Sequence, residues 1–150
     1  DSAGCQFYQA NANKYDEKLK ALALEINMMI GKIPESHRTV VVGHNAFRYF
    51  EHEYGIYFLS PQGVSTESEA AAADVAGILR QIKKDKASAV FSENISNPRL
   101  VQQIAKEAEI PVSGILFSDA LSASSGPAPT YIEMMKHNVN TIVSALTSER

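Results

Sequence analysis

Three side chains that can bind metal ions or move protons each follow an apolar segment of the sequence. His44 follows VVVG, Glu93 follows AVFS and Asp119 follows GILFS. If these segments are strands of one parallel sheet, the three residues lie near the carboxyl ends of the strands, where ligands bind in open parallel sheets. Imidazole and carboxylate groups bind zinc and manganese ions, and a histidine can also act as a general base. The spacing therefore predicts a metal site, or a small α/β hydrolase-type enzyme with His44 as general base and Glu93 or Asp119 as its partner.

Two other interpretations of the same residues stay open at this point. In a purely structural one, Asp119 caps the short turn before Ala120, Glu93 is solvated and His44 caps the helix that follows. In the other, the chain is a non-catalytic interaction or regulatory α/β domain. Phospho-acceptor domains of that kind place acidic residues after the first strand, where this chain has His44, so we rank this interpretation last.

The remaining histidines and the single cysteine are weaker candidates. We predict that His37, in a polar turn, His52, on the outer face of a short helix, and His137, in the last helix, are solvated surface residues. Cys5 cannot form an internal disulfide and lies far in sequence from His44, which gives a cysteine nucleophile little support. The sequence has no Gly-x-Gly-x-x-Gly, phosphate loop or Gly-x-Ser-x-Gly elbow, the usual marks of nucleotide binding and serine hydrolysis.

The elements that must position these residues follow from the hydrophobic pattern. Apolar or small residues at alternating steps of four and three predict one long helix over residues 8–33, ended by Pro34 and packed along a flank of the domain. Short apolar runs then alternate with amphipathic segments. Strands are expected at 39–43, 56–60, 87–92 and 111–117, helices at 45–54, 66–84, 97–108 and 131–146, and an irregular loop at 122–129. Thr66 with Glu69 predicts a capping box, and Asn97 an N-cap before Pro98 at the first helical position.

This order predicts an α/β fold, in which a four-stranded parallel sheet is flanked by helices and preceded by a long backbone helix. The 150 residues, 45% hydrophobic and 21% charged, suit one globular domain. A net charge of -3 offers no basic face for a phosphate backbone, so nucleic acid is not an expected partner. The first residues, DSAGCQFYQ, lack the basic and then apolar pattern of a signal peptide.

Five features, in order along the chain, resemble the metal-binding solute-binding proteins of ABC transporters for zinc and manganese. The long first helix is similar to the helix that joins the two lobes of these receptors. The other four are short motifs: HNAFRYF at 44–50 followed by YG at 54–55, FSE at 91–93, FSDAL at 117–121, and YIEMM at 131–135 with Asn138. The resemblance extends along essentially the whole chain.

The resemblance implies that His44 and Asp119 are metal ligands. It also implies that Glu93 is a carboxylate that orients an imidazole by accepting its remaining N–H, or an additional ligand. Members with glutamate at the position of His44 tend to be manganese or iron receptors, so the imidazole favours zinc, with manganese as the alternative. The implied cargo is a zinc or manganese ion, and no catalytic activity is implied.

The resemblance also implies a domain organisation and partners. Residues 1–34 would form the long helix between lobes and residues 35–150 the carboxy-terminal α/β metal-binding lobe. The amino-terminal lobe, with two further histidines, would be absent from this chain. Expected partners are that lobe, the membrane permease of an ABC importer and, through the exposed surface of the helix, a second copy of the chain. The expected location is the periplasm or the cell surface.

Overall fold

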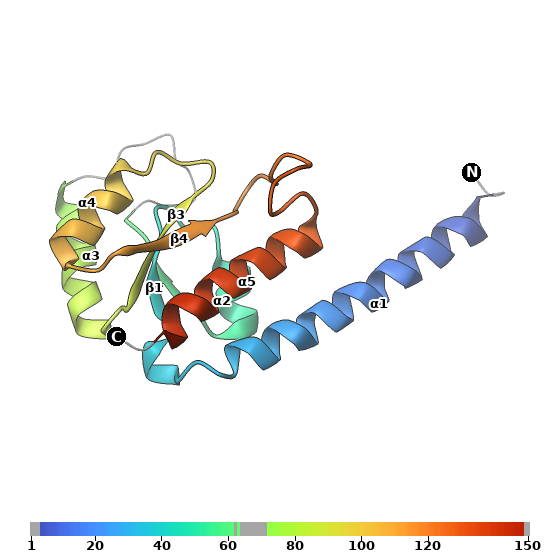
Figure 1. Cartoon of the computed structure of the whole chain (residues 1–150), viewed down its shortest axis with the longest axis horizontal. Coiled ribbons are helices and arrows are strands. Elements are labelled where there is room, and N and C mark those ends of the chain that lie inside the picture. The colour runs from blue at the N-terminus through green and yellow to red at the C-terminus, as the bar shows by residue number, and fades with distance from the viewer. Residues whose placement is uncertain (1–3, 62, 64–71, 149–150) are drawn as a thin grey trace.

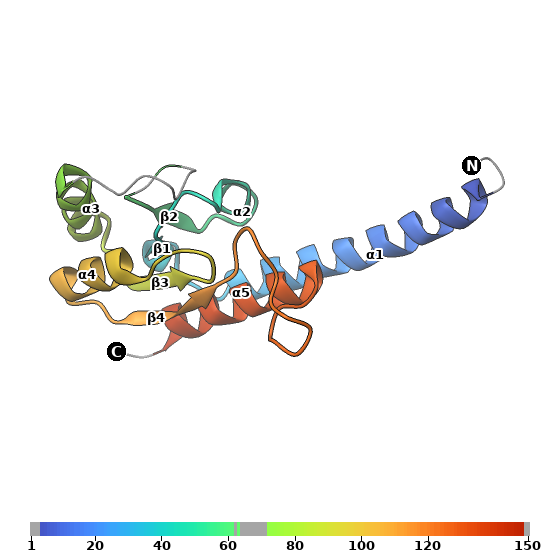
Figure 2. The same ribbon diagram turned by 90° about the horizontal axis from the view of Figure 1, so that it is seen from above.

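The chain begins with one long helix, α1 (Cys5–Ile30), that is covered along only half of its length. The computed structural model describes residues 4–61, 63 and 72–148. Leu22, Ile26 and Ile30 of α1 are buried, whereas residues 5–18 are all exposed. Figures 1 and 2 show the first half of α1 extending beyond the rest of the molecule. The predicted helix is confirmed, but the prediction that it packs along a flank is wrong for its first half, which no described residue buries.

The end of α1 is fixed by backbone and side-chain hydrogen bonds rather than by Pro34 alone. The helix ends at Ile30, before Pro34, and the N–H of Gly31 donates to the Asn27 carbonyl at 2.9 Å. The Arg38 guanidinium donates to the Ile33 carbonyl at 3.0 Å and the Ile30 carbonyl at 3.4 Å. A cation at a helix carboxyl end satisfies free carbonyls and interacts favourably with the helix dipole. Arg38 thereby ties the long helix to the start of the sheet.

Four parallel strands form the sheet in the order β2-β1-β3-β4. They are β1 (Thr39–Val41), β2 (Tyr57–Leu59), β3 (Ala89–Glu93) and β4 (Val112–Leu116). The helices that connect or follow them are α2 (Arg48–Tyr54), α3 (Ala72–Asp85), α4 (Arg99–Ala108) and α5 (Tyr131–Thr147), and a 3-10 turn covers Glu35–His37. The predicted fold class is confirmed. The predicted capping box of Thr66 and Glu69 lies outside the described residues.

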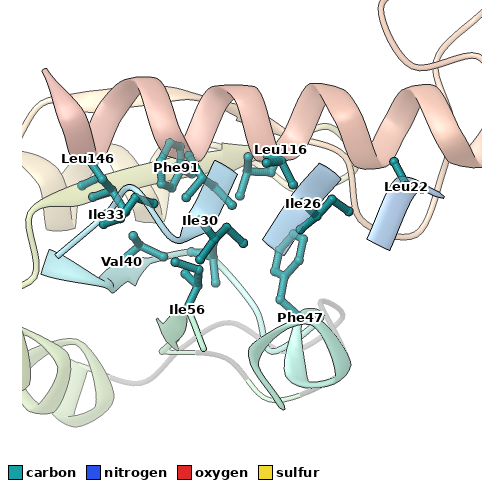
Figure 3. Close-up of a cluster of buried hydrophobic side chains, with 14 residues drawn as sticks. Leu22, Ile26, Ile30, Ile33, Val40, Phe47, Ile56, Phe91, Leu116 and Leu146 are labelled. Atoms are coloured by element: carbon teal, nitrogen blue, oxygen red, sulfur yellow. The ribbon is translucent and has the colours of Figure 1, made fainter. Parts of the chain in front are cut away.

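Alternating side chains of the strands build two hydrophobic clusters, one on each face of the sheet. Val40 and Phe91 belong to the cluster under α1, α2 and α5, whereas Val41 and Val90 belong to the cluster under α3 and α4. In Figure 3, side chains of α1 point toward those of the sheet. The first cluster comprises Leu22, Ile26, Ile30, Ile33, Val40, Val42, Phe47, Ile56, Ala89, Phe91, Leu116, Val139, Ile142 and Leu146.

Among the described residues, none of the helices combines the length and apolarity needed to cross a membrane.

The start of α4 differs by one residue from the sequence prediction. Pro98, not Asn97, occupies the capping position, and the helix begins at Arg99. The Asn97 side chain still accepts a hydrogen bond from the Arg99 N–H, at 3.1 Å. The side chain therefore satisfies a free N–H of the first turn from one position further out than expected.

Strand β4 contains a bulge that requires glycine at position 114. Val90 of β3 pairs with Val112 of β4, but Ser92 pairs with Ile115, so β4 holds one extra residue over this interval. Gly114 has φ +151°, and a Cβ there would lie 2.6 Å from Cγ2 of Thr141 in α5. Both the backbone conformation and the close approach of α5 disfavour a larger residue.

We expect Gly114→Ala to lower the free energy of unfolding by about 1–3 kcal/mol, because it adds backbone strain and a steric overlap. Urea denaturation followed by circular dichroism measures the change. Gly77→Ala is the matched control, since its Cβ would lie 3.9 Å from the Arg80 guanidinium, and alanine within α3 should be neutral or stabilising. Equal stability of the two variants would contradict the expectation.

Candidate metal centre

The three residues singled out by the sequence meet at the carboxyl ends of the central strands. His44 lies three residues beyond β1, Glu93 is the last residue of β3, and Asp119 lies three residues beyond β4. From β1 the chain passes to β2 on one side, and from β3 to β4 on the other, so the strand order reverses between β1 and β3. Parallel sheets bind ligands at such a reversal. The predicted grouping of these three residues is therefore confirmed by the fold.

Glu93 is buried beneath His44 and is hydrogen bonded to its backbone. The carboxylate Oε1 accepts the N–H of Gly43 at 2.8 Å and the N–H of His44 at 3.1 Å. Glu93 is 4% exposed, so the interpretation in which it is solvated is wrong. Burial raises the pKa of the Glu93 carboxyl above its ordinary value of 4.5. The hydrogen bonds from the backbone and the nearby imidazole offset part of that increase.

The imidazole of His44 lies between two carboxylates. Its Nδ1 contacts Oε2 of Glu93, and its Nε2 lies 3.2 Å from Oδ2 of Asp119. His44 is 1% exposed and Asp119 has a side chain that is 64% exposed, so Glu93 holds the imidazole from inside while Nε2 faces the outer carboxylate. A carboxylate at Nδ1 favours the tautomer with its hydrogen on Nδ1, which leaves a lone pair on Nε2. The arrangement suits a metal ligand held in a fixed orientation.

The structural alternative for His44 is not supported. Helix α2 begins at Arg48 with Phe47 in the capping position, and no side chain there caps the helix. The buried contact with Glu93, not a helix cap, accounts for the position of the imidazole.

The other histidines lie apart from this group, and one of them differs from its predicted environment. His37 and His52 are exposed, as predicted. His137 is partly buried, because its Nε2 lies 3.0 Å from the Ile115 carbonyl and its ring packs edge-on against Phe117. The prediction of a solvated His137 is therefore confirmed only in part, since α5 packs one side of this side chain against β4 and Phe117.

Sequence reasoning missed two asparagines that bind the loop carrying Asp119. Asn94 contacts Ser118 and Ala120, and Asn138 contacts Phe117, in each case through the side-chain amide. In the sequence, Asn138 stands out only as part of a motif, and nothing marks Asn94 except its position directly after Glu93.

Within the part of the chain that the structure describes, no group of three or more His, Cys, Asp or Glu side chains could hold a metal ion.

The sequence model of the family described as "Zinc-uptake complex component A periplasmic", ZnuA, matches residues 1–145. The chain belongs to the ZnuA family. This confirms the family resemblance predicted from the motifs. The ZnuA-family chain is similar to proteins whose names specify different metals, and in each comparison it corresponds to only part of the relative.

Two named relatives illustrate this range of metals. The ZnuA-family chain is 32% identical over 147 residues to the manganese-binding lipoprotein MntA of Halalkalibacterium halodurans. The matched region covers 98% of this chain and 49% of the relative. It is 34% identical over 146 residues to the zinc-binding protein TroA of Treponema pallidum. That matched region covers 94% of this chain and 46% of the relative. The chain therefore spans about half the length of these curated relatives.

A solved structure agrees with the fold of the ZnuA-family chain over almost its whole length. The periplasmic zinc-binding protein TroA from Treponema pallidum superposes with a TM-score of 0.91 at 30% sequence identity. The superposition covers 97% of this chain and 55% of TroA. The long first helix and the four-stranded sheet are thus features shared with a metal-binding protein.

Proposed function

We propose that this chain is the carboxy-terminal lobe of a receptor that captures a divalent transition metal outside the cytoplasm and delivers it to an ABC importer. His44 and Asp119 are the metal ligands of this lobe, and Glu93 orients the imidazole. The observation that carries the proposal is the convergence of His44 Nε2 and Asp119 Oδ2 beside a buried carboxylate that holds Nδ1. The proposed location is the periplasm or the cell surface, and the proposed partner in the membrane is the permease of the importer.

The distance between the two donor atoms supports this assignment. Bonds from zinc to imidazole nitrogen and carboxylate oxygen are about 2.0–2.2 Å, which places adjacent donors around a tetrahedral ion roughly 3.3–3.5 Å apart. The Nε2 and Oδ2 atoms lie 3.2 Å apart, just short of that range. An ion could thus replace their direct contact with little movement of either side chain.

The donor types favour zinc over manganese. An imidazole nitrogen with one carboxylate suits a borderline-soft ion, whereas manganese prefers more oxygen ligands. Glu93 does not supply a further oxygen in the observed arrangement, because its two oxygens contact backbone N–H groups and the imidazole. We therefore propose zinc as the favoured cargo, with manganese as the alternative.

The domain organisation of the proposal is supported by the exposed half of α1. Phe7, Tyr8 and Tyr15 are large apolar side chains exposed on this helix. A patch of this kind is typical of a surface that contacts another protein unit. We propose that residues 1–34 form the connection between lobes, residues 35–150 form the metal-binding lobe, and an amino-terminal lobe covers these side chains and adds ligands. Dimerisation of the chain through the same side chains stays a prediction.

Metal titration tests the proposed function directly. Calorimetric titration of the chain with Zn²⁺ and with Mn²⁺ should show binding, stronger for Zn²⁺, that His44→Ala and Asp119→Ala each weaken by at least about tenfold, because each removes one of two donors. Two donors leave coordination positions to water, so the affinity should lie well below that of a closed site. His52→Ala, an exposed histidine on α2, is the matched control. Binding that survives both site substitutions unchanged would refute the ligand assignment.

The enzyme alternative is tested by the same variants. The named relatives are metal-binding proteins, and we propose no catalytic role for His44. A hydrolase would show turnover on a panel of ester and peptide substrates that is lost in His44→Ala. Such an activity would replace the present proposal.

A further inference from the structure

The backbone around Asp119 is held by two asparagine side chains from different elements. Asn138 of α5 is 4% exposed, and its amide pairs with both backbone groups of Phe117. Its Oδ1 accepts the Phe117 N–H at 2.9 Å and its Nδ2 donates to the Phe117 carbonyl at 2.7 Å. Because both bonds go to one residue, they fix the orientation of the chain where it leaves β4.

Asn94 binds the loop on both sides of Asp119. Its Oδ1 accepts the Ser118 N–H at 3.2 Å, and its Nδ2 donates to the Ala120 carbonyl at 3.0 Å. Its own N–H donates to the Leu116 carbonyl at 3.1 Å. One side-chain amide thus bridges the residues that precede and follow Asp119, and this bridge fixes the turn from which the carboxylate projects.

The Asp119 carboxylate needs such support because its own side chain has little packing. The side chain is 64% exposed, yet Oδ2 lies 3.2 Å from the buried Nε2 of His44. An exposed side chain keeps a defined position when the backbone that carries it is fixed. Asn94 directly follows Glu93 at the end of β3. Of these two consecutive residues, Glu93 contacts the imidazole of His44, and Asn94 forms hydrogen bonds to the loop that carries Asp119.

We infer that Asn94 and Asn138 are positioning residues for Asp119, which hold its carboxylate beside His44 Nε2 through hydrogen bonds to the backbone of residues 117–120. The consequence for metal binding rests on the proposed function. Residues that orient metal ligands without touching the metal typically contribute 10–100-fold to affinity. Asn94→Ala should therefore lower the affinity for Co²⁺ about tenfold.

The experiment uses the 150-residue chain, with Co²⁺ as the probe because its visible absorption reports both binding and coordination geometry. Asn94 is the residue to replace, since it is exposed and its loss should not prevent folding. Asn138→Ala would leave both partly buried backbone groups of Phe117 without these partners, so a failure to fold would not be informative. The matched control is Asn97→Ala, another exposed asparagine whose side chain bonds a backbone N–H, that of Arg99.

A measurement without metal keeps the inference separate from the proposed function. In the metal-free chain, the nitrogen-15 shift of His44 Nε2 should change in Asp119→Ala, change in the same direction in Asn94→Ala, and stay unchanged in Asn97→Ala. With Co²⁺, Asn94→Ala should weaken binding about tenfold relative to Asn97→Ala. An Asn94→Ala chain with the parent Nε2 shift and the parent Co²⁺ affinity would overturn the inference. Co²⁺ binding that Asp119→Ala leaves intact would refute the ligand assignment instead, and the metal-free shift would still decide the role of Asn94.

Discussion

Replacing Glu93 with glutamine should weaken Zn²⁺ binding by about 10–100-fold while leaving the chain folded. The glutamine oxygen can still accept the N–H groups of Gly43 and His44, which Oε1 accepts in the structure. Its NH₂ group would take the place of Oε2 and donate to Nδ1 of His44. The imidazole would then carry its hydrogen on Nε2, the nitrogen that faces Asp119, and the lone pair needed by a metal ion would be lost.

Calorimetry with Zn²⁺ at one fixed pH measures this effect, and nitrogen-15 spectra of the imidazole report the tautomer. Glu51→Gln is the matched control, because the Glu51 carboxylate also accepts a backbone N–H, that of Phe58 at 3.3 Å, and its removal changes the net charge equally. An unchanged Zn²⁺ affinity in Glu93→Gln would show that Glu93 does not act through the tautomer of His44. An equal loss of Zn²⁺ affinity in both variants would show that the effect arises from the change in net charge alone.

Substitutions of the two proposed ligands should have very different effects on stability, although each removes one proposed metal donor. His44→Ala should lower the free energy of unfolding of the metal-free chain by about 2–4 kcal/mol, because it leaves a cavity and deprives the buried Glu93 of its imidazole partner. Asp119→Ala should change it by less than about 0.5 kcal/mol, since its side chain is 64% exposed.

Urea denaturation of the metal-free chain, followed by circular dichroism, separates the two outcomes. His52→Ala controls for the loss of an exposed histidine and should behave like Asp119→Ala. Similar losses of stability in His44→Ala and Asp119→Ala would contradict the burial of His44 beneath the site. A contrast between them would show that His44 belongs to the core and Asp119 to the surface.

The general position of the candidate site could be predicted because it depends on local patterns. Runs such as VVVG and AVFS are apolar on both faces, as central strands covered by helices must be. Polar residues directly after such runs lie at the ligand-binding edge of a parallel sheet, regardless of the conformation of the loops. His44, Glu93 and Asp119 could therefore be grouped without coordinates.

The contacts within the site could not be predicted, because they join residues far apart in sequence. Glu93 and the His44 amide are separated by 49 positions, and His44 and Asp119 by 75. Which atoms meet depends on strand register, and one extra residue in β4 at the bulge changes where the following loop begins. The burial of Glu93 and the contacts of Asn94 with Ser118 and Ala120 both depend on that register.

The exposed half of α1 shows the same division between local and tertiary information. Regular spacing of apolar residues predicted a long helix over residues 8–33, close to the observed Cys5–Ile30, since periodicity reports the face of a helix. Periodicity does not report what covers that face, and Tyr8 and Tyr15 are exposed whereas Leu22 and Ile26 are buried. The α/β fold, the long helix and the grouping of the three candidate residues could be predicted, because these features depend on near neighbours along the chain. The position of His44 between a buried and an exposed carboxylate could be found only in the folded chain, because it depends on how strands and loops distant in sequence pack together.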